Sequence, residues 1–164
     1  MNRWYRPLSV CTVLCGALLA WAADKDDTPR VKLSKEEQAI LDLTNQAREK
    51  EKLPPLKANA VLTEVARAHS ANMAKKGELK HVLDDKTPAQ RVTAAGYEFR
   101  AVGENIAWGE GMSPRDIFKL WMGSEHHREN ILREGYEEIG IGMVRAKGGE
   151  VYYTQVFGTQ RDKR

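Results

Sequence analysis

Apolar residues recur at helical spacing along two stretches in the first half of the chain. The first stretch follows Ser34 and Glu37, whose side chains form a capping box, and it continues to the proline pair at 54–55. A helix is therefore predicted to begin at Ser34 and to end before these prolines. The second stretch predicts a helix over residues 59–76, with Gly77 as its C-terminal stop.

Shorter helices and β-rich segments follow in the second half. Thr87 and Ser113 each stand directly before a proline, which predicts a helix start at each position. Residues 138–144 and 151–157 are rich in β-forming residues and are joined through two glycines, as in a β-hairpin. Residues 99–108 are predicted as a third strand, or as a strand that leads into a loop partway along. Together these elements predict one α+β domain in which helices cover an antiparallel sheet.

The first 22 residues have the pattern of a secretory signal peptide. Arg3 and Arg6 form a basic start, residues 8–20 are mostly apolar, and Ala20-Trp21-Ala22 matches a cleavage site. The apolar run is too short to span a membrane comfortably. We therefore expect a secreted or periplasmic protein with no transmembrane span in the mature chain.

Both cysteines, Cys11 and Cys15, lie inside this apolar stretch. Lipid attachment to a cysteine is an alternative to simple cleavage. Val10 and Leu14, however, are poor matches to the small residue expected before a lipidated cysteine. After cleavage the mature chain has no cysteine, which excludes disulfide bonds and thiol catalysis.

Composition narrows the class of protein further. The 164 residues include 26 Lys and Arg against 23 Asp and Glu, a net charge of +3 with the two signs interspersed. Nucleic-acid-binding proteins usually present a clustered basic face, so we expect no nucleic-acid partner. Residues 23–33 are polar and are predicted to be a flexible lead-in. Residues 34–160 are long enough to bury one core, and we expect a monomeric domain there.

Four histidines remain in the mature chain: His69, His81, His126 and His127. His69 lies on the apolar side of its predicted helix and is interpreted as a core residue, whereas His126 is expected to face solvent. Two local patterns place a carboxylate near a glycine or a histidine, namely Gly103-Glu104-Asn105 and Ser124-Glu125-His126-His127. Imidazole and carboxylate groups are the only strong metal ligands available without a thiol, but each pattern alone is weak.

Five motifs, taken in order, resemble the CAP superfamily, which comprises cysteine-rich secretory proteins, antigen 5 and pathogenesis-related 1 proteins. The motifs are Leu62-x-x-Val65-Ala66-x-x-His69-Ser70-x-x-Met73-Ala74 followed by His81, Gly103-Glu104-Asn105-Ile106-Ala107, Trp121-Met122-x-Ser124-Glu125-x-His127-Arg128-x-Asn130-Ile131-Leu132, Ile139-Gly140-Ile141-Gly142, and Tyr153-Thr154-Gln155-Val156-Phe157. The resemblance extends over about residues 34–158, and the third motif has the form typical of bacterial members.

The resemblance implies a three-layer α-β-α sandwich with a central antiparallel sheet and a cleft that holds histidines and glutamates. It assigns metal binding to His81 and catalysis to Glu104 and Glu125. The second histidine of eukaryotic members falls on Tyr152 here, and His127 is the predicted replacement. The implied cofactor is zinc or another divalent metal, with Glu104 or Glu125 as the base that takes a proton from a metal-bound water.

Two functions from different classes follow. The first is a secreted binding or interaction module for a lipid, glycan, peptide or protein ligand, with a His/Glu cleft that can hold a divalent metal. The second is a zinc-dependent, peptidase-like hydrolase that uses the same cleft. The first is preferred, because two histidines make a weak site beside the three protein ligands usual in catalytic zinc centres. Whether the protein is an enzyme is left open at this point.

Overall fold

The computed structural model describes the chain except for residues 2–30 and 163–164. Residues 2–22 of the predicted signal peptide and residues 23–30 of the predicted lead-in therefore lie outside the described residues. Within the part that is described, no helix combines the length and the hydrophobicity that a membrane span requires.

Apart from α5 and β1, the described helices and strands begin and end close to the predicted positions. In chain order they are α1 (Lys35–Lys50), β1 (Lys57–Ala58), α2 (Ala60–Lys76), α3 (Pro88–Ala94), β2 (Phe99–Glu110), α4 (Pro114–Gly123), α5 (Glu125–Leu132), β3 (Glu138–Arg145) and β4 (Glu150–Gln160). Ser34, Thr87 and Ser113 each form a capping box at the start of a helix. Asn59 caps α2, and Gly77 ends it in the left-handed conformation. The local signals in the sequence are thus confirmed.

The described strands form one four-stranded sheet in the order β1-β3-β4-β2. β3 and β4 make the predicted hairpin, and β2 pairs with β4 antiparallel. The short β1 pairs with β3 in parallel, so the sheet is mixed at one edge and antiparallel elsewhere. β2 runs without a break through Gly103, which makes it a strand along its whole length and the opposite edge of the sheet.

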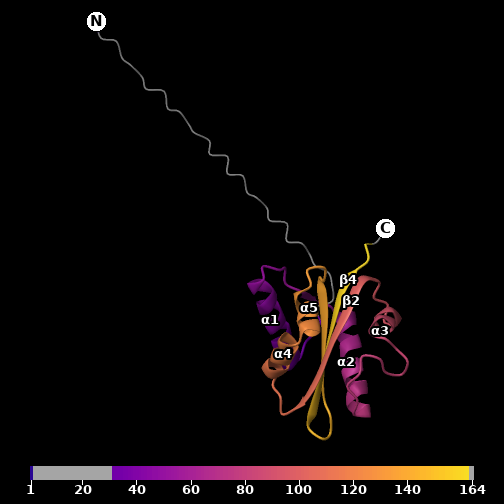
Figure 1. The fold of residues 1–164 in the computed structure, drawn as a ribbon. Helices are drawn as coiled ribbons and strands as arrows, with labels where there is room; N and C mark the ends of the chain where they lie inside the picture. The colour runs from indigo at the N-terminus through magenta and orange to yellow at the C-terminus, as the bar shows by residue number, and fades with distance from the viewer. Residues whose placement is uncertain (2–30, 163–164) are drawn as a thin grey trace.

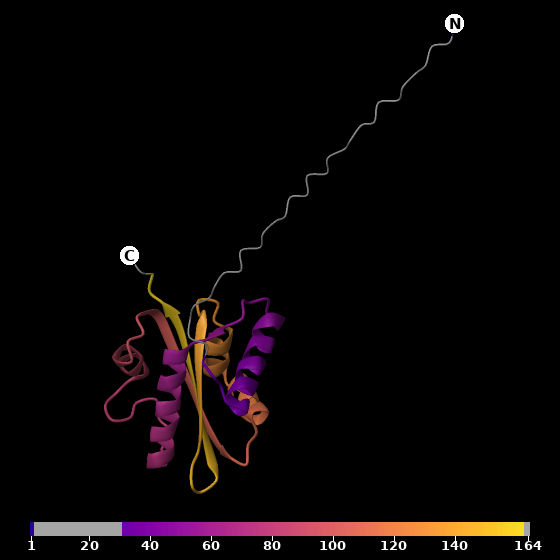
Figure 2. The same cartoon turned by 180° about the vertical axis from the view of Figure 1, so that it is seen from behind.

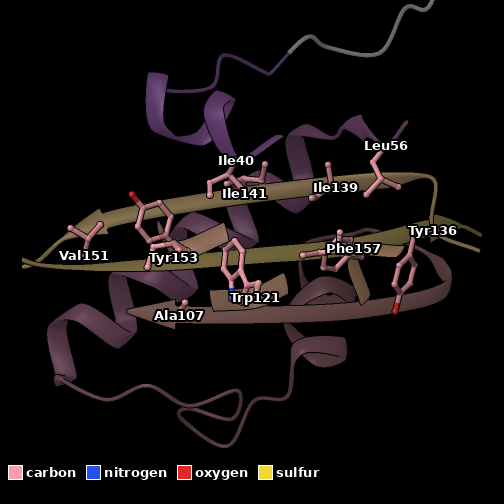
Figure 3. Packing of buried hydrophobic residues seen from close by; sticks show 12 residues of the cluster. Ile40, Leu56, Ala107, Trp121, Tyr136, Ile139, Ile141, Val151, Tyr153 and Phe157 are labelled. Atoms are coloured by element: carbon pink, nitrogen blue, oxygen red, sulfur yellow. The ribbon is translucent and has the colours of Figure 1, made fainter. Parts of the chain in front are cut away.

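Helices cover both faces of the sheet, so the predicted α+β sandwich of three layers is confirmed. Figures 1 and 2 show α2 and α3 on one side of the strands and α1, α4 and α5 on the other. Alternate residues of β4 serve the two sides: Tyr153 and Phe157 pack with α1, α4 and α5, while Val156 packs with α2 and α3. Figure 3 shows the first of these cores, in which Trp121 of α4 lies against the middle of the sheet.

α2 lies unusually close to β3. A Cβ atom added at Gly140 would come within 2.0 Å of the main chain of Leu62, and one added at Gly142 would come within 2.3 Å of the main chain of Ala66. The two glycines therefore let the backbone of α2 approach the sheet where any side chain would hold it away. This approach brings the inner face of α2, including His69, up to the sheet.

α5 and β1 are not predicted by the pattern along the chain. Ser124 precedes α5 but makes no side-chain capping bond, and Ile131 is the one residue of this helix that is fully buried. A helix with neither a cap nor an apolar stripe carries little local signal. α5 is held instead by contacts with other elements, since Ile131 joins the core that Trp121 belongs to.

Candidate functional site

Glu104 lies in the middle of β2, and its side chain is only 1% exposed. Its Oε1 accepts a hydrogen bond from Nδ1 of His81 at 2.9 Å, and its Oε2 accepts one from Nη2 of Arg91 at 2.6 Å. A buried carboxylate requires such partners, because leaving it unpaired would be very costly. Glu104, His81, Arg91 and His69 together form a polar group on the α2–α3 side of the sheet, here named the Glu104 cluster.

His81 has one ring nitrogen committed and one available. Because a carboxylate only accepts hydrogen bonds, Nδ1 of His81 carries the proton that it shares with Glu104. In the neutral ring Nε2 then has a free lone pair. The side chain is 48% exposed, so a ligand can reach this ring. The structure therefore places the predicted pair His81 and Glu104 together, with the carboxylate orienting the imidazole.

Arg91 of α3 was not identified from the sequence, yet it joins Glu104 to the loop before α3. Its Nη1 donates to the main-chain carbonyls of His81 at 2.9 Å and Lys86 at 2.8 Å, while its Nη2 holds Glu104. Little in the sequence indicates this role, since Arg91 is only a basic residue one turn after the helix cap at Thr87. Its partners lie on a loop and a strand, which no periodic pattern connects to it.

His69 of α2 is buried, as predicted for a core residue, and it also reaches the cluster. Its Nε2 lies 3.0 Å from the carbonyl of Lys80 and 3.7 Å from Oε1 of Glu104. Burial lowers the pKa of His69; the Glu104 carboxylate opposes this effect, and the Arg91 guanidinium reinforces it. The ring is therefore neutral near pH 7 and donates through Nε2, because a carbonyl can only accept.

The other predicted site residues lie on α5 and are less tightly held. His127 is half-buried, and its pKa is lowered first by burial and then by the charges that nearby His81 and His126 can carry. Glu125 starts α5 and is exposed, and among the described residues no side-chain hydrogen bond or ion pair joins it to Glu104, His81 or His127. The side chain of His126 is 93% exposed, as expected.

A chain of buried amides attaches α5 to the sheet. Asn105 of β2 donates to the carbonyl of His127 at 3.0 Å and to the side chain of Gln155 at 3.1 Å, and it accepts from Asn130 at 2.9 Å. Asn130 also donates to the carbonyl of Glu104 at 3.3 Å. Glu104 and Asn105 therefore use opposite faces of the same strand, one holding the loop before α3 and the other holding α5.

Tyr152, which stands where eukaryotic relatives are expected to carry a second histidine, is a packing residue here. It is buried with Met73, Leu83 and Ile106, and its ring stacks with that of Trp108 at a centroid distance of 6.4 Å. Trp108 remains 48% exposed. An apolar contact thus occupies this position of the sheet in place of an imidazole.

A cavity of about 720 Å³ lies between α2 and α3, directly beside the Glu104 cluster. Small apolar side chains make up much of its walls: Ala60, Val61, Val65, Ala68, Leu83, Ala94 and Ala95. His69 and Arg91 of the cluster also line it, and Glu64, Asp84 and Lys86 add charge. The cavity is therefore mostly apolar, with charged side chains contributed by α2, α3 and the loop before α3.

The donor set around Glu104 does not fit a tightly held metal ion. Throughout the described residues, no group of three or more His, Cys, Asp or Glu side chains is arranged so that it could hold one. His81 and His127 offer two imidazoles, one ligand fewer than a catalytic zinc centre usually has. Glu104 is a poor third ligand, because each of its oxygens already accepts a hydrogen bond and the Arg91 guanidinium at Oε2 repels a second cation.

Fold and cluster together define a three-layer α-β-α domain with a buried glutamate bound to a histidine and an arginine. The profile of the cysteine-rich secretory protein family, CAP, matches residues 41–157, and the chain belongs to this family. It is 35% identical over 123 residues to the uncharacterized protein YkwD of Bacillus subtilis (strain 168), a match that covers 74% of this chain and 47% of YkwD. The chain thus spans less than half the length of the curated relatives that it matches.

Solved structures show the same fold. An extracellular protein containing a SCP domain from Bacillus anthracis is 28% identical, with a TM-score of 0.70 over 80% of this chain and 45% of that one. An outer surface protein of Borrelia burgdorferi is 19% identical, with a TM-score of 0.74 over 82% of this chain and 99% of that one. A crystal structure of NaASP2 with Zn²⁺ is 17% identical, with a TM-score of 0.57 over 79% of this chain and 83% of that one.

Proposed function

We propose that this protein is an extracytoplasmic binding module whose ligand occupies the cavity between α2 and α3. The observation that carries the proposal is the cavity of about 720 Å³, a volume in the range of pockets that hold small molecules. The signal-peptide pattern supports a location outside the cytoplasm, and so does the likeness to the extracellular protein of Bacillus anthracis.

The lining favours a ligand with an apolar body and a polar end. The alanine and valine side chains of α2 and α3 offer an apolar surface that can contact a hydrocarbon or a nonpolar side chain. Lys86 and Arg91 also line the cavity, together with the carboxylates of Glu64 and Asp84. Among the lipid, glycan, peptide and protein ligands considered from the sequence, a lipid-like amphiphile matches this lining best.

The zinc-dependent hydrolase is the weaker alternative. A general base needs a carboxylate oxygen that can reach the water it activates, and each oxygen of the buried Glu104 already accepts a hydrogen bond from His81 or Arg91. Glu125 is exposed and makes no polar side-chain contact with the described residues of the cluster. The metal roles of His81 and His127 stay predictions. The metal content of protein purified without chelator or nickel affinity, beside His81→Ala and His127→Ala, tests them.

Ligand binding can be tested by filling the cavity from its open side. Ala68 of α2 is exposed and lines the cavity, so Ala68→Trp places an indole in the cavity without entering the core. We expect this variant to bind the fluorescent amphiphile 1-anilinonaphthalene-8-sulfonate at least about tenfold more weakly than the unmodified protein, because the same space is taken.

Ala71→Trp is the matched control, since Ala71 is an exposed alanine of the same helix that does not line the cavity. It is expected to bind the probe as the unmodified protein does. Equal binding by all three proteins would exclude the cavity as the ligand site. Zinc that co-purifies with the protein, together with peptide cleavage that His81→Ala abolishes, would favour the hydrolase instead.

A further inference from the structure

The contacts of Arg91 converge on one loop and one carboxylate. Nη1 binds two main-chain carbonyls of the loop between α2 and α3, those of His81 and Lys86, and Nη2 binds Oε2 of Glu104 on β2. The guanidinium therefore connects three segments that are separate in the sequence. It also holds the main chain of His81 while Glu104 holds the ring of the same residue.

The loop before α3, residues 77–87, contains little regular structure of its own. Leu83 and Lys86 form an isolated bridge, and Asp84 and Asp85 adopt positive φ angles of 53° and 55°. Aspartate tolerates positive φ better than most residues other than glycine, but two in succession still cost energy, which contacts with other elements offset. Asp84 pairs with Lys76, but both side chains are substantially exposed, and such surface pairs contribute little. The Arg91 side chain is 13% exposed and also binds the buried Glu104, so it is the better shielded of the two anchors.

The guanidinium also supplies the positive charge that Glu104 requires. The side chain of Glu104 is 1% exposed and that of Arg91 is 13% exposed, so this pair is shielded from water far more than the exposed ion pairs are. A cation that approached Glu104 would be repelled by a fixed positive charge already bound at Oε2. His69 is neutral on this side, and His81 shares its proton with the carboxylate.

We propose that Arg91 is the internal cation of this site: it neutralises Glu104, positions His81, and holds the loop before α3 in place without a metal ion. In this arrangement the guanidinium supplies the positive charge and the cross-links that a divalent metal bound between His and Glu side chains would otherwise supply. Arg91 is thus a positioning residue, and the wall of the α2–α3 cavity that Leu83 and Lys86 contribute depends on it.

Zinc titration of Arg91→Met distinguishes this role from simple structural support. Removing the guanidinium frees Oε2 of Glu104 beside His81 and His69, so zinc affinity is expected to rise roughly tenfold or more. An unfolded chain also binds zinc through its exposed histidines, so the gain counts only where the circular dichroism spectrum and the melting curve of Arg91→Met show a folded protein. Arg100→Met is the matched control, because Arg100 forms an exposed ion pair with Glu137. It is expected to leave zinc affinity unchanged.

Two further measurements keep the proposal testable if Arg91→Met fails to fold. In the unmodified protein, chelator treatment and zinc addition are both expected to leave the ¹⁵N resonances of the His81 ring unchanged. Arg91→Lys keeps the charge but replaces the two nitrogens of the planar fork with a single ammonium nitrogen. It is expected to bind zinc no better while amide exchange in residues 77–87 becomes faster.

Three outcomes would overturn the proposal. The first is tight zinc binding by the unmodified protein that is lost in His81→Ala. The second is unaltered zinc affinity in a folded Arg91→Met variant. The third is unchanged amide exchange of residues 77–87 in Arg91→Lys. Because zinc affinity, ring resonances and amide exchange are measured without an amphiphile, these outcomes are independent of whether the proposed amphiphile binds.

Discussion

Gly140→Ala tests the close packing of α2 on the sheet. The added Cβ would lie 2.0 Å from the carbonyl carbon of Leu62, 2.2 Å from its oxygen and 2.3 Å from the nitrogen of Thr63. All three are main-chain atoms of a helix, so no side chain can rotate aside. α2 must move away by roughly 1 Å or more to reach an ordinary van der Waals separation, and a gap of that size forfeits up to about half of the dispersion energy of each contact.

The expected loss of stability lies at or above the upper end of the usual overpacking range, about 3 kcal/mol. The displaced helix carries Leu62, Val65 and Ala66, which belong to the core on that side of the sheet. For a domain of this size such a loss lowers the melting temperature by about 10 °C. Thermal unfolding followed by circular dichroism, supported by urea denaturation, measures both quantities.

Gly123→Ala is the matched control, because a Cβ at this last residue of α4 meets no atom within 4 Å. It is expected to leave stability unchanged or to raise it by up to about 1 kcal/mol, since alanine restricts the unfolded chain more than glycine does. The packing argument is refuted if Gly140→Ala melts within about 2 °C of the unmodified protein.

Two further substitutions test buried charges. Arg48 of α1 is fully buried and donates to four main-chain carbonyls, so Arg48→Met is expected to cost about 3 kcal/mol in urea denaturation, with the exposed Arg115→Met as a neutral control. Burial raises the pKa of Glu37, but hydrogen bonds from Arg67 and the Ser34 amide outweigh this and lower it below 4.5. Because the pKa is lower in the folded state, Glu37 stabilises the fold above that pH, and this stabilisation is lost as the pH falls. Glu37→Gln is therefore expected to flatten the acid side of the stability profile, and an unchanged profile would contradict the assignment.

The sequence alone determined where most of the helices start and stop. Ser34, Thr87 and Ser113 each bond to an amide only three residues along, and Gly77 ends α2 through its own backbone conformation. Such interactions need no partner from elsewhere in the chain, so they can be predicted from a few consecutive residues. The hairpin of β3 and β4 could be predicted for the same reason, because its turn joins consecutive segments.

The resemblance to the CAP family also identified Glu104 and His81 correctly as neighbours, although they are 23 residues apart. Local pattern could not have paired them. It likewise could not reveal α5, whose single fully buried residue, Ile131, is stabilised by the core formed with other elements. The two-residue β1 exists only because β3 lies beside it.

Only the tertiary structure decided what the cluster contains. Arg91 reaches Glu104 13 residues along the chain, and His69 approaches it from another helix that two glycines allow to lie close to the sheet. A guanidinium can bind any carbonyl or carboxylate that the fold brings within its reach. Its partners therefore do not follow a periodic pattern in the sequence and cannot be predicted from one. Capping bonds join residues a few positions apart, whereas the contacts of Arg91 exist only once α2, α3 and β2 have packed together.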